Sequence, residues 1–164
     1  MRLEKIFHTD DSARQLILRL ALGFVMFPHG AQKMLGWFGG EGFSATIGLF
    51  GAHGMPAAIA FLVIIGEFFG SLGMITGLLT RVSAGGVVAI MLGAIGLVHA
   101  PNGFFMNWQG HQKGEGFEYH LLVVGMALVL VVFGGGRYSL DAVIARRLAA
   151  RGRKGTHEHA EARS

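Results

Sequence analysis

Four long apolar segments, separated by short polar connections, constrain most strongly what this chain can fold into. The third segment, "VSAGGVVAIMLGAIGLVH" from Val82 to His99, carries no charged residue before its terminal histidine. A helix of this length in a soluble core would show a polar stripe at helical spacing. Because this segment has none, the pattern predicts a membrane-spanning helix rather than the core helix of a soluble protein.

The four segments predict four membrane spans between a short N-terminal segment and a C-terminal extension. A span needs about 20 residues, and about 17 are the lower limit. We expect an all-α fold, with a cytoplasmic segment 1–12, a four-helix transmembrane bundle over 13–138 and a cytoplasmic extension 139–164. The expected spans cover approximately residues 13–34, 56–79, 82–99 and 117–136.

The composition agrees with a membrane protein and limits its chemistry. Hydrophobic residues make up 52% of the 164 residues and charged residues only 15%, too little charge to cover a soluble domain of this size. The 27 glycines suit membrane helices, whose backbones approach closely at small residues. Cysteine is absent, which excludes disulfides and thiolate-bound metals or iron–sulfur clusters in this chain. Any redox role therefore needs a cofactor or a partner that carries the electrons.

Two amphipathic helices are expected beside the bundle. In the first outer connection, Phe43, Ile47 and Phe50 share one helical face, which predicts a short helix in the membrane interface. After Ser139, apolar and basic residues at helical spacing predict a juxtamembrane helix on the anionic inner leaflet. The polar residues 155–164 are predicted to be a disordered tail.

Basic residues lie where a membrane topology explains them. Both ends of the chain are rich in Lys and Arg, and Arg81 lies in the tight turn between the second and third spans. Cytoplasmic connections carry an excess of Lys and Arg, so we expect a multi-pass protein with both termini in the cytoplasm. A nucleic-acid-binding surface is the weaker explanation of these residues. The expected partner is membrane lipid, and no nucleic acid partner is expected.

Glu67 is the most unusual residue of the apolar segments, since it lies near the middle of the second span. An exposed charge at that depth costs about 3 kcal/mol or more. A stripe of small residues, which marks a helix-packing face, runs beside it and consists of Gly66, Gly70, Gly73 and Gly77. The carboxyl group is therefore expected to face the bundle interior, to be protonated or to pair with a base.

Several polar residues are expected to share the outer half of the bundle with Glu67. Arg19, His29 and Lys33 share one face of the first span, and antiparallel packing places Glu67 between the depths of Arg19 and His29, with His29 and Lys33 in the outer half. The outer ends of the third and fourth spans add His99, Glu118 and His120.

Three interpretations of this cluster remain open. In the first, Glu67 pairs with Arg19 or His29 and only fixes the helix register. In the second, the cluster relays protons or contacts a quinone-like head group, since imidazole and carboxylate groups exchange protons near physiological pH. In the third, the histidines bind haem or copper, although no paired spacing on one helix supports a metal site.

The order and spacing of several strings resemble the DoxX family of small bacterial membrane proteins. These strings are "HGAQKMLG" at 29–36, "GEFFGSLGMITGLLTR" at 66–81, "VHAPNGFF" at 98–105, "FEYHLL" at 117–122 and "GGGRYSLD" at 134–141. The resemblance implies a four-helix bundle in the bacterial inner membrane and a link to redox physiology. Some members of the family are subunits of a thiosulfate:quinone oxidoreductase.

The resemblance extends to polar positions without assigning them settled catalytic roles. The matching positions are His29, Lys33, Glu67, Arg81, Glu118, Arg137 and Asp141. For Arg81 a structural role at a cytoplasmic turn is expected. Asp141 is expected to lie in the first turn of a helix, where a negative charge suits the helix dipole.

We therefore expect an integral membrane subunit of an oxidoreductase system with a quinone-proximal or proton-handling site. Its catalytic residues are expected to be Glu67, His29 and Lys33, and its head-group or cofactor contacts His99, Glu118 and His120. The cofactor is not identified by the sequence, with quinone favoured over haem or copper. The alternative is a non-enzymatic membrane scaffold that docks a soluble redox partner through the basic C-terminal helix.

Overall fold

The computed structural model describes residues 7–161, and within that range the chain forms six α-helices and no strand. The helices are α1 (Arg14–Leu35), α2 (Phe43–Ala52), α3 (Ala57–Thr76), α4 (Thr80–Ala94), α5 (Glu118–Phe133) and α6 (Leu140–Glu161). A π-helical turn, Ile95–His99, and a 3₁₀ turn, Ala100–Asn102, continue α4. The predicted all-α fold is confirmed.

Two helices in the described part of the chain are long and apolar enough to cross a membrane. They are α3, with 20 residues, and the continuous helical segment Thr80–Asn102, with 23. The apolar helix α5 is shorter, with 16 residues, because Gly134 takes a positive φ of 77° and ends it at Phe133. Length and composition thus support the predicted second and third spans.

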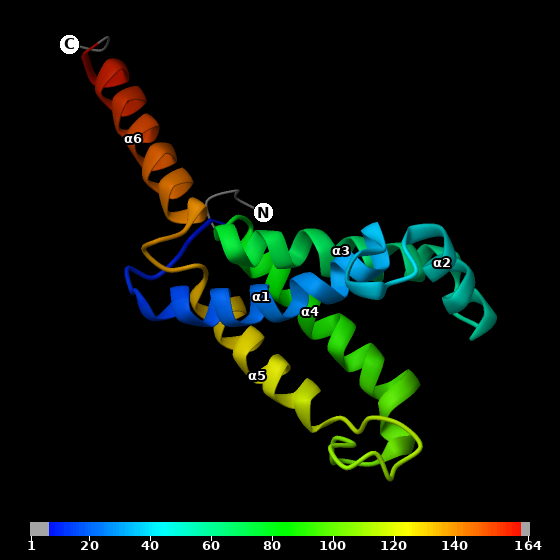
Figure 1. Ribbon diagram of the computed structural model, residues 1–164. Helices are drawn as coiled ribbons and strands as arrows, with labels where there is room; N and C mark the ends of the chain where they lie inside the picture. The colour runs from blue at the N-terminus through cyan, green and yellow to red at the C-terminus, as the bar shows by residue number, and fades with distance from the viewer. Residues whose placement is uncertain (1–6, 162–164) are drawn as a thin grey trace.

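Helices α1 and α3 lie side by side and approach most closely where α1 carries glycine (Figure 1). A Cβ added to Gly30 would lie 2.6 Å from the backbone nitrogen of Phe68. A Cβ added to Gly23 would lie 2.6 Å from the side chain of Ile75. The absence of a side chain at Gly30 brings this part of α1 directly against Glu67 and Phe68.

Three members of the predicted glycine stripe, Gly66, Gly70 and Gly73, face α4 as a helix-packing face should, whereas Gly77, just after α3, faces Arg19 and Ser139. A Cβ at Gly66 would lie 3.0 Å from Ile90, and one at Gly73 would overlap the side chain of Ser83. Helix α4 in turn packs along α5. The hydrophobic core between the four helices is made of Leu22, Met26, Met74, Ala84, Val87, Met91, Val123, Ala127 and Leu130.

Polar contacts close the bundle at the end where α6 begins. Arg19 is fully buried, and its guanidinium donates hydrogen bonds to the carbonyl groups of Met74, Ile75, Gly135 and Tyr138 at 2.8–3.1 Å. Asp141 is also buried, and its carboxylate accepts hydrogen bonds from the backbone N–H groups of Leu79 and Thr80 at 2.7 and 2.8 Å. Asp141 lies in the first turn of α6 as predicted, but it caps the start of α4.

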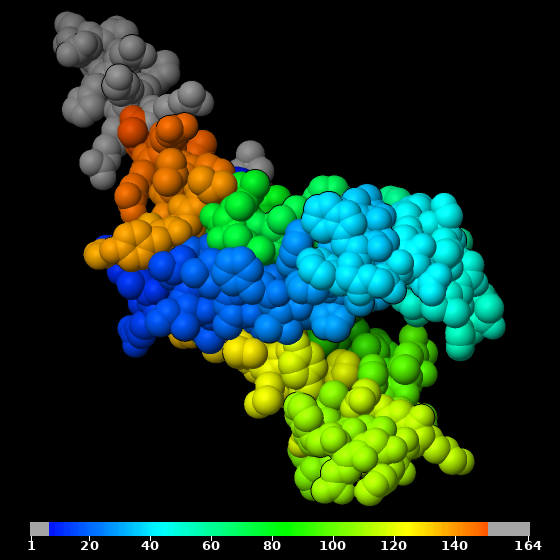
Figure 2. Space-filling model, viewed as in Figure 1, coloured from blue at the N-terminus to red at the C-terminus, as the bar shows by residue number. Residues whose placement is uncertain are grey.

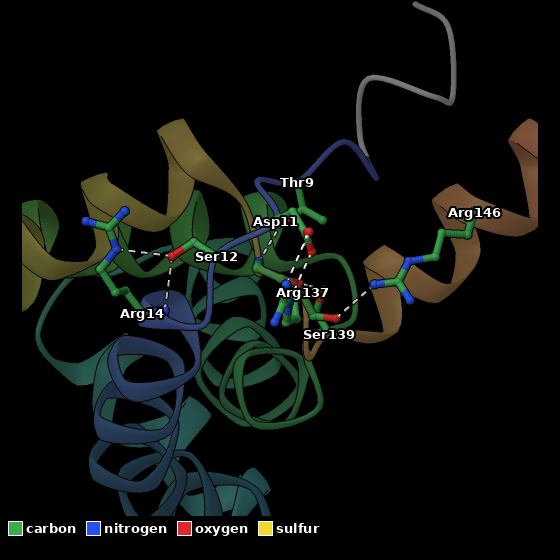
Figure 3. A network of polar contacts seen from close by, with 8 residues as sticks. Thr9, Asp11, Ser12, Arg14, Arg137, Ser139 and Arg146 are labelled. Carbon is green, nitrogen blue, oxygen red and sulfur yellow. Dashed lines mark hydrogen bonds and ion pairs between the residues drawn. The ribbon is translucent and has the colours of Figure 1, made fainter.

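The segment before α1 is attached to the same end of the bundle. Figure 3 shows Thr9 and Asp11 beside Arg137, which lies between α5 and α6. Arg137 binds the Asp11 carboxylate at 3.3 and 3.4 Å. The hydrogen bond from Arg137, together with its charge, lowers the pKa of the Asp11 carboxyl below its ordinary value. Arg81 binds the carbonyl groups of His8 and Val131, so it joins this segment to α5 as well as anchoring its own turn.

Away from this end the two helix pairs diverge. In Figure 1, α1 and α3 form one arm, and α4 and α5 form the other, with the connection 103–117 at its tip. The space-filling view in Figure 2 shows the same two arms separated at their far ends. The molecule is therefore closed at one end and splayed at the other.

The C-terminal extension differs from its prediction in one respect. The helix α6 begins after Ser139 as predicted, and Ser139 caps it, because its Oγ accepts a hydrogen bond from the N–H of Ala142 at 3.1 Å. However, α6 continues to Glu161, over most of the segment that was predicted to be disordered. Within the helical part of this segment, Glu158, Ala160 and Glu161 favour helix despite Gly155, which explains the difference. Residues 162–164 lie outside the described residues.

Candidate functional site

A cavity of about 960 Å³ lies where the two arms diverge. Its walls come from α1, the end of α2, α3, α4 with its π-helical turn, the connection 103–117 and α5. Most of the lining side chains are apolar, so its few polar groups stand out. They are His29, Lys33, Glu67, His99, Trp108, Glu115, Tyr119 and His120.

The first polar group in the cavity is an ion pair between the two helices of one arm. Lys33 Nζ on α1 lies 2.6 Å from Glu67 Oε2 on α3. The Glu67 side chain is 6% exposed and that of Lys33 is 24% exposed. The pair therefore presents a shielded carboxylate whose partner still reaches the cavity.

The ion pair identifies the partner of Glu67. Arg19 was one of two residues expected to pair with it, but Arg19 is held by four carbonyl groups at the closed end of the bundle. His29, the other candidate, lies one turn from Lys33 on α1 and lines the cavity, but it forms no ion pair with Glu67 among the described residues. The open interpretation in which Glu67 pairs with Arg19 or His29 is therefore contradicted, and Lys33, the third candidate on the first span, is the partner.

The second polar group is a pair of imidazole rings on the other arm. The rings of His99 and His120 lie 4.1 Å apart, centroid to centroid. His99 is the last residue of the π-helical turn, an irregularity that is frequent at functional sites. This turn directs the end of α4 toward the start of α5, where His120 lies.

The proton positions on His99 follow from its hydrogen bond. His99 Nδ1 lies 2.9 Å from the backbone carbonyl oxygen of Glu115. A carbonyl oxygen only accepts, so Nδ1 carries the hydrogen and Nε2 of the neutral ring is left as an acceptor. His99 therefore has the arrangement of an oriented base.

Two buried polar atoms at the cavity wall have no hydrogen-bond partner within the described residues. They are Nδ1 of His120, a residue that is only 8% exposed, and the phenol oxygen of Tyr119. Buried polar groups are usually hydrogen-bonded, and an unpaired one costs about 1–3 kcal/mol. Both residues line the cavity, so a bound molecule could supply the missing partner.

Glu118 does not belong to this constellation, although it was grouped with His99 and His120 in the prediction. Its carboxylate accepts hydrogen bonds from the N–H of Met106 at 2.9 Å and from Trp108 Nε1 at 3.3 Å. It holds the connection 103–117 in place and does not line the cavity. Glu118 is next but one to His120 in sequence, but residues two apart on a helix point about 200° away from each other, so nearness in sequence does not bring their side chains together.

Sequence reasoning missed Glu115 and Tyr119. Glu115 comes from an irregular connection, where no periodic pattern predicts proximity. Tyr119 was visible as the neighbour of His120 in the string "FEYHLL". Among the residues that the structure describes, three or more metal-ligating side chains do not come together, so the histidines form a pair only.

The comparison with known protein families decides where this chain belongs. The model of the DoxX family matches residues 14–100, from the start of α1 to the end of the π-helical turn of α4. The chain belongs to the DoxX family. The matched range includes His29, Lys33, Glu67 and His99. Glu118 and His120 lie beyond it.

A curated relative extends the comparison. The chain is 30% identical, over 115 residues, to the protein named "Putative oxidoreductase CatD" of Bacillus subtilis (strain 168). The similarity covers 70% of this chain and 76% of that protein. No solved structure matches the chain significantly. Members of the DoxX family are associated with membranes, which agrees with the two apolar helices described above.

Proposed function

We propose that this DoxX-family chain is a four-span membrane subunit of an oxidoreductase system that binds a quinone-like head group in its cavity and exchanges protons with it. The observation that carries the proposal is the shielded Lys33–Glu67 pair on the wall of a large, mainly apolar cavity. The name of the Bacillus subtilis relative supports a redox role.

The chemistry of a quinone fits the distribution of polar groups. Its reduction to the quinol takes two electrons and two protons, and its ring and substituents are otherwise apolar. In the proposal, the carboxyl group of Glu67 gives or accepts a proton, and Lys33 holds it in position through the 2.6 Å contact. His99 Nε2, an acceptor, takes a hydrogen bond from a hydroxyl of the quinol form, and His29 contacts the other oxygen of the head group. The electrons come from a partner protein or a reducing co-substrate, since this chain has no cysteine for thiol chemistry.

The proposed topology places the cavity in the outer half of the membrane. The closed end carries Arg81, Arg137 and the basic helix α6, and positively charged connections face the cytoplasm. Both termini are then cytoplasmic in a bacterial inner membrane. The splayed end, with α2 and the connection 103–117, faces outward.

The decisive test is Glu67→Gln in the complex purified from native membranes in a mild detergent. The variant keeps the size and hydrogen-bonding ability of the side chain but cannot exchange a proton. We expect quinone-linked turnover to fall about 100-fold, the typical contribution of a general acid–base group, while expression stays normal.

The matched control is Glu41→Gln, which changes an exposed carboxyl group before α2 that does not line the cavity. Turnover of the control should equal that of the native protein. Native turnover in the Glu67→Gln variant would count against the proposal.

A scaffold function is the second candidate, because α6 projects away from the bundle (Figure 1). Leu140 and Val143 in its first turn are 45% and 40% exposed. Removing residues 143–164, which keeps the Asp141 cap, should release a soluble partner while the bundle stays folded. Unchanged co-purification of that partner would contradict the scaffold function.

A further inference from the structure

The cavity is longer than a head group needs, and its far part is apolar. It extends along α4 from Gly86 to Leu97, about 16 Å at the rise of an α-helix. On this side its wall includes several small residues, namely Gly66 of α3 and Gly86, Ala89, Gly93 and Ala94 of α4. Open space surrounds Gly86 and Gly93, because a Cβ added at either position meets no atom within 4 Å.

The rim of this part is apolar and exposed. Four large side chains line the cavity and are also open to the surroundings: Ile59 (47% exposed), Leu62 (60%), Leu97 (71%) and Val98 (57%). They belong to the two helical segments that are long and apolar enough to cross a membrane. An exposed apolar rim on such helices faces lipid, so the cavity opens toward the bilayer.

The two parts of the cavity have different chemistry. The head part holds the Lys33–Glu67 pair, His99 and the unpartnered Nδ1 of His120, which is more than nine-tenths buried. The part of the cavity along α4, called the groove below, is lined by the small residues of α3 and α4 and the aliphatic rim residues named above. A single molecule that satisfies both parts has a ring head with hydrogen-bonding oxygens and a hydrocarbon chain.

We propose that a chain-bearing quinone or quinol enters sideways from the bilayer through the cleft between α3 and α4. Its head lies between the Lys33–Glu67 and His99–His120 pairs, and its chain lies in the groove beside Gly86 and Gly93. Nδ1 of His120 gains a hydrogen-bond partner from a ring oxygen. This inference rests on the proposed function and adds the entry route and the role of the hydrocarbon chain.

The test uses Trp108, which lines the cavity, as the reporter. The chain has two tryptophans, and Trp37→Phe leaves Trp108 as the only one. This protein is placed in phospholipid nanodiscs, and its fluorescence is titrated with a decyl-substituted benzoquinone or with the same ring bearing a methyl group. Saturable quenching measures occupation of the cavity.

Gly86→Leu is expected to separate the two ligands. Its Cβ meets no atom within 4 Å, and Gly86 lines the cavity, so the added side chain is expected to occupy the groove. Binding of the decyl compound should weaken tenfold or more, whereas binding of the methyl compound should stay within twofold. The matched control is Gly85→Leu, which adds the same side chain on the same helix, also in open space, at a position that does not line the cavity. It should leave both ligands unchanged.

His120→Phe keeps a ring at the head part but removes both nitrogens, so it should weaken both ligands tenfold or more. Equal binding of the decyl compound to the Gly86→Leu and Gly85→Leu proteins would contradict the proposal that the hydrocarbon chain lies in the groove. A phospholipid that stays in the groove in the presence of excess decyl compound would contradict it too. The proposed function would survive either result. Absence of saturable quenching by both ligands in the parent protein would instead contradict the proposed function itself.

Discussion

At the scale of single residues, the most demanding side chain is Arg19. It is fully buried, yet its guanidinium reaches four carbonyl groups from two separate segments. Two of these, on Met74 and Ile75, lie at the end of α3, where the helix dipole favours a cation. The fork of donors on arginine suits this task, and a lysine ammonium group does not reproduce it.

Arg19→Lys should therefore destabilise the bundle although it keeps the charge. A single ammonium group cannot reach both α3 and the 135–138 segment, and each lost charge-assisted hydrogen bond is worth about 1.5 kcal/mol or more. We expect a loss of about 3 kcal/mol in the free energy of unfolding, measured by denaturant titration in detergent. Arg14→Lys, at an exposed position on the same helix, should change stability by less than about 0.5 kcal/mol.

The Lys33–Glu67 pair allows stability and function to be separated. Lys33→Met leaves the Glu67 carboxyl group in the bundle without its partner, which should cost about 2–3 kcal/mol, somewhat less than for a fully buried pair. The double variant Lys33→Met/Glu67→Met should recover most of that stability. It should not recover quinone-linked turnover. Restored turnover in the double variant would show that the pair only holds the helices together.

At the scale of whole elements, α4 depends on a residue that comes 61 positions later in the chain. Asp141 binds the first free N–H groups of α4, although it belongs to α6. Leu79, just before α4, has a positive φ of 51°, a conformation that a branched apolar residue rarely adopts. The carboxylate of Asp141 thus stabilises a strained turn and joins three helices.

Asp141→Ala should destabilise the turn between α3 and α4. Loss of a helix-capping group costs about 1–2 kcal/mol. Asp141→Asn, which keeps one acceptor oxygen, should cost less than Asp141→Ala. Hydrogen exchange should be faster at the N–H groups of Leu79 and Thr80 in both variants, in the same order. Equal exchange in the native protein and Asp141→Ala would contradict the capping role.

The contact between α1 and α3 depends on Gly30. A methyl group there would lie 2.6 Å from the Phe68 nitrogen, so the two backbones must separate. Gly30→Ala should cost about 1–3 kcal/mol. Gly48→Ala, in open space on α2, should be neutral or slightly stabilising because alanine favours helix. Thermal unfolding of both variants in the same detergent provides the comparison.

At the scale of the whole molecule, one closed end and one splayed end explain how a small bundle can contain a cavity. Arg19, Asp141 and Arg137 connect the helices and the chain segments at the closed end. At the other end the described residues form no such polar contact between the two arms, and α4 and α5 diverge there from α1 and α3 (Figure 1). Stability and ligand binding are thus located at opposite ends of the same helices.

The proposed topology can be tested directly because the chain has no cysteine. A single cysteine introduced as His53→Cys, after α2, should react with a membrane-impermeant maleimide in spheroplasts. One introduced as Arg146→Cys, in α6, should react only after the membrane is permeabilised. Both positions are exposed, so a difference in reactivity reflects the side of the membrane. The opposite pattern would invert the proposed orientation.

The sequence by itself determined the helical segments and the need to shelter Glu67. Hydrophobic runs and glycine positions indicate where helices begin and end and which face is free to pack, since these depend on neighbouring residues in the chain. His29, Lys33, Glu67, His99 and His120 were all expected near one another, and all line the cavity.

Only the tertiary structure decided which of these groups pair. A helical wheel gives the angle of a side chain about its axis, but not the rotation and depth of one helix against another. For this reason Lys33 rather than Arg19 or His29 became the partner of Glu67. The structure also shows that the Glu118 side chain contacts Trp108 of the connection 103–117. The chain folds back after α5, and this brings Asp141 to the start of α4. These contacts join residues that are distant in sequence or depend on irregular backbone, where local patterns carry no information.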